Sequence, residues 1–207
     1  VLLFDLGDVI VRGFKGTERA LADELQLPPE KIHRQFHEPE LRELFLGQIS
    51  EEQFLTTLIT RHRWNITIDQ LRQRILDNMI ELEGMFALLE DLKRRQTNMA
   101  LLSNHASPWV EHVEQRYPQL VEHIPHRFYS HLIHLAKPDP LAFRTAADAL
   151  GVPPREILFI DDHQPNLIGA SSIGMHTLQF HTPHQLRNAL TTMGYLQVDG
   201  IRSPRSS

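Results

Sequence analysis

Short, mainly apolar runs recur along this chain, the first of them wholly apolar, and they constrain its fold more than any other feature. The four runs are residues 1–4, 99–102, 157–160 and 177–180. Continuous apolarity over so few residues is typical of strands covered on both faces, as in a parallel sheet. The helical patterns between the runs lie at about 84–96, 108–116, 139–150 and 165–173. This alternation predicts an α/β fold with a doubly wound, mainly parallel, Rossmann-like sheet.

The segment after the first run has a different pattern, because it contains several amphipathic helices and no convincing strand. Two of these helices begin with a capping box, at Ser50 and at Thr67, in which a hydroxyl and a glutamine three residues later bond each other's exposed amides. We therefore expect a helical insertion after the first strand. The expected division is an α/β core at residues 1–13 and 86–195, the helical insertion at 14–85, and a C-terminal tail at 196–207.

The composition limits the kinds of protein that this chain can be. Its 207 residues are 41% hydrophobic and 23% charged, as in an ordinary globular chain of one large domain or two small ones. The net charge of -5 is unlike the basic surface that neutralises phosphates in nucleic-acid-binding proteins, so no nucleic-acid partner is expected. The absence of cysteine excludes disulfides and thiolate nucleophiles.

The apolar segments also bear on membranes and location. No apolar run reaches the roughly 20 residues that a membrane-spanning helix needs, so no membrane partner is expected. Residues 1–10 are interrupted by Asp5 and Asp8 and lack a basic leader, which favours a buried strand over a signal peptide. These features predict a cytoplasmic protein. No sequence feature demands a dimer, and a monomer is the default expectation.

Polar residues end the first three apolar runs, and in an open α/β sheet the carboxyl ends of strands form the ligand-binding crevice. The residues expected there are Asp5, Ser103, Asp161 and Asp162, with Lys137 from a nearby loop. Neighbouring carboxylates repel each other unless a cation lies between them. Mg²⁺ is the natural candidate, since it is a hard ion that prefers oxygen ligands. With a lysine and a hydroxyl to hold a phosphate, the set indicates phosphoryl transfer.

Four segments in order carry a resemblance to a known family. They are Phe-Asp-Leu-Gly-Asp-Val-Ile at 4–10, Leu-Leu-Ser-Asn at 101–104, Ala-Lys-Pro-Asp-Pro at 136–140 and Phe-Ile-Asp-Asp-His-Gln-Pro-Asn at 159–166. Together they resemble the four motifs of the haloacid dehalogenase (HAD) superfamily, over nearly the whole chain, and the insertion is similar to its all-helical cap domain. The first segment is similar to a phosphatase branch that acts on sugar phosphates such as glucose 1-phosphate.

The resemblance implies a Mg²⁺-dependent phosphatase of small phosphorylated metabolites and a role for each matching residue. Asp5 would be the nucleophile that forms an aspartyl-phosphate. Ser103 and the backbone amide of Asn104 would hold phosphate oxygens. Lys137 would neutralise charge between Asp5 and the phosphoryl group.

The same resemblance implies a metal site. Asp162 would ligate Mg²⁺ together with Asp5 and the backbone carbonyl of Gly7. Asp161 and Asn166 would orient these ligands from outside the coordination sphere.

One departure from the family pattern affects the expected rate. Active members usually carry a second Asp two residues after the nucleophile as general acid and base, and this chain has Gly7 there. Successive side chains of an extended segment point to opposite sides, so Asp8, one position later, need not face the leaving group. Loss of a positioned acid/base costs about 10²–10⁴-fold in rate. We predict a slow phosphatase, or one favouring good leaving groups, unless Asp8, a cap residue or water substitutes.

Two other functions fit the same residues. A 2-haloacid dehalogenase shares the Asp nucleophile and the Ser-Asn segment but needs no metal. The pair Asp161 and Asp162 argues against it, because extra acid disfavours a carboxylate substrate and a departing halide. A catalytically impaired domain that binds a phosphorylated ligand or a protein partner is supported only by Gly7.

The 13 histidines and the aromatic residues add further expectations. The histidines suggest a zinc site, but the pairs among them lack an obvious third ligand. His105 and His163 follow crevice residues directly and are therefore expected near the substrate. Phe14, Trp64 and the apolar pattern at 41–58 are expected to form the core of the insertion.

Overall fold

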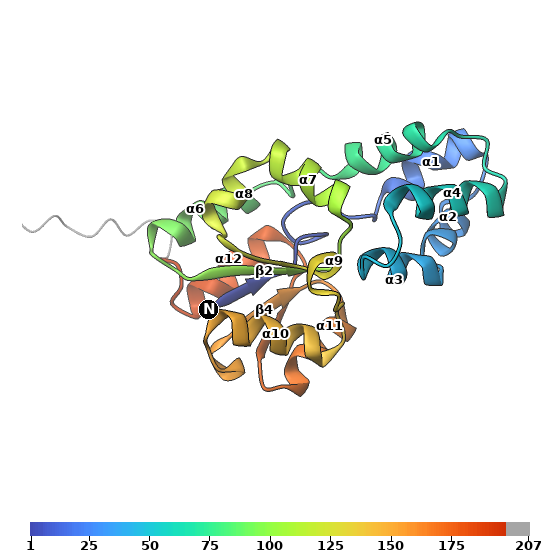
Figure 1. Cartoon of the computed structure of the whole chain (residues 1–207). Helices are drawn as coiled ribbons and strands as arrows, with labels where there is room; N and C mark the ends of the chain where they lie inside the picture. Colours follow the sequence, from blue (N-terminus) through green and yellow to red (C-terminus); the bar gives the residue numbers. More distant parts are fainter. Residues whose placement is uncertain (198–207) are drawn as a thin grey trace, which may run out of the picture.

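Five parallel strands form the centre of the structure, a computed structural model that describes residues 1–197 (Figure 1). They are β1 (Leu2–Phe4), β2 (Met99–Ser103), β3 (His126–Tyr129), β4 (Leu158–Asp161) and β5 (His176–Gln179). Their order across the sheet is β3-β2-β1-β4-β5, with every neighbouring pair parallel. The predicted α/β fold with a parallel sheet is confirmed, and the four runs overlap β1, β2, β4 and β5. The expectation that all four strands are covered on both faces is wrong for β5, an edge strand with no buried residue, whose run also contains Thr177 and Gln179.

Strand β3 was not predicted from the sequence. It lies at the edge of the sheet, and of its four residues only Tyr129 is buried. A partly covered edge strand needs no continuous apolar run, and the sequence of β3, His-Arg-Phe-Tyr, has none. The other edge strand, β5, was found because its segment keeps Leu178 and is followed by Phe180.

Helices cover both faces of the sheet (Figure 1). One face carries α6 (Met85–Arg94), α7 (Ser107–Arg116), α8 (Pro118–His123) and α12 (Pro183–Thr192), and the other carries α10 (Pro140–Leu150) and α11 (Gln164–Ser172). The short α9 (Ser130–Ile133) follows β3, and a 3₁₀ turn (Pro154–Glu156) precedes β4. In β1, Leu2 and Phe4 pack with the first group of helices and Leu3 with the second, as the alternation of side chains along a strand requires.

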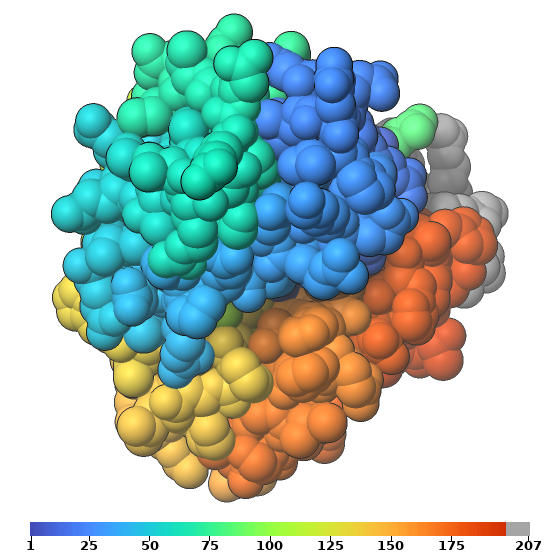
Figure 2. All heavy atoms as spheres, turned by 90° about the vertical axis from the view of Figure 1, so that its right-hand side faces the viewer, coloured from blue at the N-terminus to red at the C-terminus, as the bar shows by residue number. Residues whose placement is uncertain are grey.

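Five helices lie between β1 and α6, in the part of the chain where a helical insertion was expected. They are α1 (Thr17–Leu25), α2 (Pro29–Phe36), α3 (Pro39–Phe45), α4 (Glu51–His62) and α5 (Ile68–Asn78). Both predicted capping boxes are present: the hydroxyls of Ser50 and Thr67 accept from the amides of Gln53 and Gln70, at 3.1 and 3.2 Å. In Figure 2 these helices, blue to teal, meet the yellow and orange residues of the sheet domain.

Two short segments connect the five helices to the sheet domain, and they pair with each other. The amide of Arg12 donates to the carbonyl of Ile80 at 2.8 Å, and the amide of Leu82 donates to the carbonyl of Ile10 at 3.0 Å. The side chain of Asn78 donates to the carbonyl of Gly13 at 2.7 Å. The two connecting segments, residues 10–13 and 78–82, are therefore hydrogen-bonded to each other.

The end of the described chain differs from the expected tail. Leu196, with which that tail was expected to begin, is buried in the main core, and residues 198–207 lie outside the described part. Within residues 1–197, none of the helices is both long enough and apolar enough to cross a membrane.

Candidate active site

The register of the sheet places the strand-terminal polar residues at one edge. Phe4 lies opposite Leu101 of β2 and Ile160 of β4. The residue after it, Asp5, donates its backbone amide to the carbonyl of Ile160 at 2.9 Å and so lies at the carboxyl end of β4. Ser103 is the last residue of β2 at the same edge. The polar residues expected in one crevice are therefore brought together.

A buried lysine joins two of the acids. Lys137 Nζ lies 2.8 Å from Asp5 Oδ1 and 2.7 Å from Asp161 Oδ2, and the lysine is only 3% exposed. The side chain of Asn104 fixes the loop that carries the lysine: its amide donates to the carbonyl of Lys137, and its oxygen accepts from the Lys137 amide, both at 2.9 Å. The sequence had pointed only to the backbone amide of Asn104, so this side-chain contact was missed.

Asp161 is held from several sides. Besides the lysine, its carboxylate accepts from the His163 amide at 2.7 Å and from the side-chain amide of Asn166 at 3.0 and 3.1 Å. It is fully buried. These bonds already satisfy both carboxylate oxygens, and they fix Asp161 in position behind its neighbours Asp5 and Asp162.

Burial and the neighbouring charges shift the pKa values of the three acids in this cluster. Burial raises the pKa of Asp5 to about 7, although Lys137 opposes the rise, and Asp161 adds to it. Burial acts in the same direction on Asp161, but the lysine and the donated hydrogen bonds bring its pKa below the usual value. Burial and the neighbouring Asp161 raise the pKa of Asp162. Asp5 and Asp162 therefore lose their protons less readily than ordinary carboxyl groups unless a further positive charge lies beside them.

The donor set fits a hard divalent cation. Oxygens of Asp5, Asp161 and Asp162 lie within 4.8 Å of one another, and within the described residues no other cluster of three such side chains could hold a metal. Because Asp161 already accepts bonds at both oxygens, Asp5 and Asp162 are the carboxylates free to face the ion. All donors are oxygens, which is the ligand type that Mg²⁺ prefers.

A cavity of about 470 Å³ opens onto the cluster between the sheet edge and helices α2 and α3. Of the candidate residues, only Asp161 does not line it; Asp5, Gly7, Ser103, Asn104, Lys137, Asp162 and Asn166 all do. His105 and His163 also line it, as their sequence positions indicated.

The insertion supplies the wall of the cavity that faces the acids. Its polar contributors are Lys15, His33 and His37, none of which the sequence analysis had singled out. The only signal was the spacing of the two histidines, four residues apart, with His33 on α2 and His37 directly after it; their ring centroids lie 4.1 Å apart. Phe14, which was expected in the core of the insertion, packs edge-on against Trp109 at 4.7 Å and also lines the cavity.

Gly7, at the position where family members carry the acid/base, and its neighbour Asp8 both lie shortly after the end of β1. Asp8 has a left-handed backbone (φ 58°), and its Oδ1 accepts from the Gly13 amide at 3.1 Å, so its carboxylate helps close the turn after β1. A Cβ on Gly7 would lie 3.5 Å from Gly13 Cα and 3.6 Å from His105 Nε2, which are ordinary contact distances. The His105 ring is thus a direct neighbour of any side chain placed at position 7.

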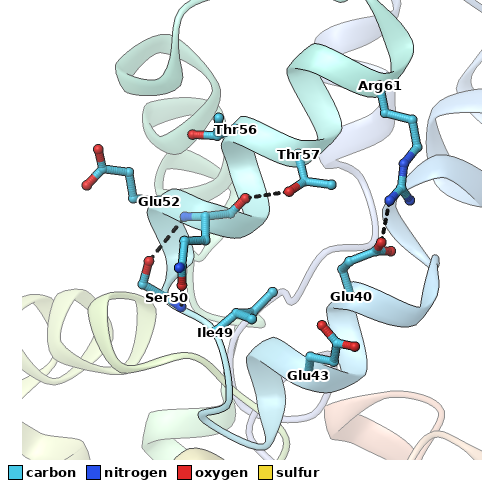
Figure 3. A pocket seen from close by; sticks show the side chains of 9 residues that line it. Glu40, Glu43, Ile49, Ser50, Glu52, Thr56, Thr57 and Arg61 are labelled. Atoms are coloured by element: carbon cyan, nitrogen blue, oxygen red, sulfur yellow. Dashed lines mark hydrogen bonds and ion pairs between the residues drawn. The ribbon is translucent and has the colours of Figure 1, made fainter.

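The insertion has a second groove, of about 740 Å³, between α3 and α4 (Figure 3). Carboxylates of Glu40, Glu43 and Glu52 line it, and Arg61 pairs with Glu40 across it. None of the catalytic, substrate-binding or metal-binding candidates from the sequence lines this groove, so the cavity at the sheet edge is the candidate active site.

Comparisons with known proteins match most of the chain. The haloacid dehalogenase-like hydrolase family matches residues 1–174. A flavin mononucleotide hydrolase of Arabidopsis thaliana is 27% identical over 195 residues, which cover 94% of this chain and 77% of that protein.

Two solved structures illustrate the shared fold. A HAD family enzyme of Bacteroides thetaiotaomicron, in complex with magnesium and inorganic phosphate, matches with a TM-score of 0.67 and 20% identity over 87% of this chain and 93% of that chain. The L-2-haloacid dehalogenase of Xanthobacter autotrophicus, with chloropropionic acid covalently bound, gives 0.66 and 15% over 92% and 82%. At these identities the likeness establishes the fold, and the reaction has to be inferred from the residues of the site.

Proposed function

Because this chain belongs to the haloacid dehalogenase-like hydrolase family, we propose that it hydrolyses small phosphorylated metabolites, with sugar phosphates favoured, in a Mg²⁺-dependent reaction. One observation carries the proposal. Three carboxylates, those of Asp5, Asp161 and Asp162, lie within 4.8 Å of one another beside a single buried lysine, Lys137. This excess of negative charge favours a metal ion, whose positive charge would then attract a phosphate, and without such an ion it disfavours the carboxylate substrate of a dehalogenase.

The proposed reaction has two steps. A carboxylate oxygen of Asp5 attacks phosphorus, the bond from phosphorus to the leaving oxygen breaks, and that oxygen takes a proton from water. Water then hydrolyses the aspartyl-phosphate, which releases inorganic phosphate and restores the carboxylate. Lys137 offsets the charge between Asp5 and the phosphoryl group, while the Ser103 hydroxyl and the Asn104 amide hold phosphoryl oxygens.

Asp5, Asp162 and the carbonyl of Gly7 would hold the ion, which supplies positive charge beside the phosphoryl oxygens. Asp161 and Asn166 keep the site in place through their mutual hydrogen bonds. We also propose that residues 14–85 act as a cap over a core of residues 1–13 and 86–195, since His33 of α2, Phe45 of α3 and His37 between these helices line the cavity. The cap side chains would then contact the part of the substrate beyond the phosphate.

A substrate panel tests the proposal. It contains sugar phosphates, nucleotides, amino-acid phosphates, flavin mononucleotide and p-nitrophenyl phosphate, each with Mg²⁺ and with EDTA. We expect phosphate release that EDTA abolishes and that the Asp5→Asn variant lacks. Full activity in EDTA contradicts the metal requirement, and halide release from 2-chloropropionate identifies a dehalogenase instead. If no substrate turns over while phosphate still binds, the chain is a binding protein.

A further inference from the structure

Apart from the two chain neighbours of Gly7, the imidazole of His105 carries the only polar atom of the described residues within 4 Å of the position that a Cβ on Gly7 would take. Its Nε2 lies 3.6 Å from the position that a Cβ on Gly7 would take, and His105 lines the same cavity as Asp5. The residue is 4% exposed, and its ring lies edge-on to Trp109 with centroids 6.2 Å apart. The proposed mechanism assigns this buried polar side chain no role.

The backbone around His105 fixes where the ring can lie. The amide of His105 donates to the Ser130 hydroxyl at 3.1 Å, and its carbonyl is 2.7 Å from Nδ1 of His131. Both partners belong to α9, which follows the edge strand β3. The backbone that carries the ring is therefore held by the sheet domain, while the ring itself also lies beside Phe45 of α3, with centroids 6.4 Å apart.

The surroundings also fix the protonation of the ring. Burial, together with the charges of Lys137 and His131, lowers the pKa of His105 to about 3, so the imidazole is neutral and carries one N–H. Nδ1 is buried and has no hydrogen-bond partner within the described residues. A donor sealed away from any acceptor is unfavourable, so the hydrogen belongs on Nε2. His105 thus presents an N–H donor toward the space beside Gly7.

We propose that the Nε2–H of His105 donates a hydrogen bond to the leaving-group oxygen of the phosphorylated substrate, from the space that the missing side chain of Gly7 provides. This rests on the proposed phosphatase function. In-line attack by Asp5 directs the leaving oxygen away from Asp5 and into the cavity. As the bond to phosphorus breaks, its electron pair stays on that oxygen, and a fixed N–H stabilises the negative charge. The proton that completes the alcohol comes from water, because a neutral imidazole keeps its own.

Two variants separate this role from packing. His105→Leu fills much of the ring's space without a donor, whereas His105→Gln keeps an N–H near the position of Nε2. The substrates are a series of alkyl and aryl phosphates with leaving groups of increasing pKa, assayed with saturating Mg²⁺. His176→Leu, an exposed position at the start of β5, serves as the matched control.

We expect His105→Leu to lower kcat by about 10²–10³-fold for alkyl phosphates and far less for p-nitrophenyl phosphate, whose leaving group needs little help. His105→Gln should recover most of the loss, and the slope of rate against leaving-group pKa should steepen only in the Leu variant. Equal losses on all substrates, or no loss on alkyl phosphates, overturn the proposal.

The nitrogen chemical shifts of the ring give a second readout that needs no turnover. We expect the neutral Nε2–H form of His105 across pH 5.5–8, a range of roughly one unit or more either side of an ordinary histidine pKa. A hydrogen on Nδ1, or a charged ring within that range, overturns the proposal even if the protein is a phosphatase. Wild-type protein that hydrolyses no phosphate ester overturns the proposed function itself and the role of His105 with it.

Discussion

Lys137 Nζ lies 2.8 Å from Asp5 Oδ1, and both groups are buried beneath the cavity. Replacing Lys137 by Met leaves two buried carboxylates without their counter-charge. We expect kcat/KM to fall by at least about 10²-fold and the free energy of unfolding without Mg²⁺ to fall by about 3–5 kcal/mol.

Steady-state kinetics and urea unfolding measure these two effects. Lys93→Met is the matched control, because Lys93 forms an exposed pair with Glu122, and its loss should cost less than about 1 kcal/mol. Equal stability of the two variants would contradict a buried charge cluster at the site.

The raised pKa of Asp5 predicts how Mg²⁺ binding depends on pH. Burial brings this pKa to about 7 in the metal-free protein, so below pH 7 a proton competes with the ion for the carboxylate. We expect the Kd for Mg²⁺, measured by calorimetry, to rise as the pH falls from 8 to 6, by up to about tenfold per unit below the pKa. Asp5→Asn should remove most of this dependence. Equal affinity at pH 6 and pH 8 in the wild type would show that Asp5 is ionised throughout.

The same shift predicts a loss of stability on the alkaline side. The folded protein binds the Asp5 proton more tightly than the unfolded chain, whose pKa is near 3.8. This group's contribution to stability is therefore fully present below about pH 4 and is lost as the pH rises through about 7. Mg²⁺ should restore it, so the ion should raise Tm more at pH 8 than at pH 6. A larger rise at pH 6 would refute the assignment.

A buried hydrogen bond ties the five-helix insertion to the sheet domain. Trp109 of α7 donates its indole N–H to Glu51 of α4 at 3.0 Å, and Arg72 of α5 donates to the other oxygen at 2.8 Å. Glu51→Ala leaves both donors without this acceptor. We expect about 1–3 kcal/mol lower stability and a raised KM, because the cavity wall loses its anchor.

The charge and the acceptor at Glu51 can be separated. Glu51→Gln keeps an oxygen for Trp109 and should lose less stability, while Glu52→Ala, one residue along on the exposed side, should change little. Denaturation and steady-state kinetics on the three variants test this. A Glu51→Ala variant with wild-type stability and KM would show that the tie does not position the cap.

Gly7 and His105 should be coupled. Gly7→Asp adds the carboxylate that active family members carry; its Cβ makes only ordinary contacts, one of them with His105 Nε2 at 3.6 Å, so we expect the longer side chain to compete with the imidazole for space. In a His105→Ala background we expect Gly7→Asp to raise kcat on alkyl phosphates by about 10²-fold or more. In the wild-type background the gain should be smaller. The same factor in both backgrounds would show that the two positions act independently.

The sequence predicted those features that leave a local pattern of apolar or charged residues. The apolar runs predicted four of the strands, and the polar residues that follow them, from Asp5 to Asp162, meet at one edge as expected. Edge strand β3 was missed because partial burial needs no apolar run. The wall formed by His33 and His37 depends on how the insertion packs onto the core, and no local pattern records that. The same holds for the clamp between the Asn104 side chain and Lys137, which joins residues 33 positions apart.

The covalent intermediate on Asp5 is the central claim, and trapping it is the most direct test. Wild-type protein is mixed with Mg²⁺ and a phosphorylated substrate that it hydrolyses, quenched in acid within the first turnover, digested and analysed by mass spectrometry. We predict one phosphoryl group on the peptide that contains Asp5, absent with EDTA and absent in Asp5→Asn. Full turnover without that modified peptide, or a phosphoryl group on another residue, would contradict the account.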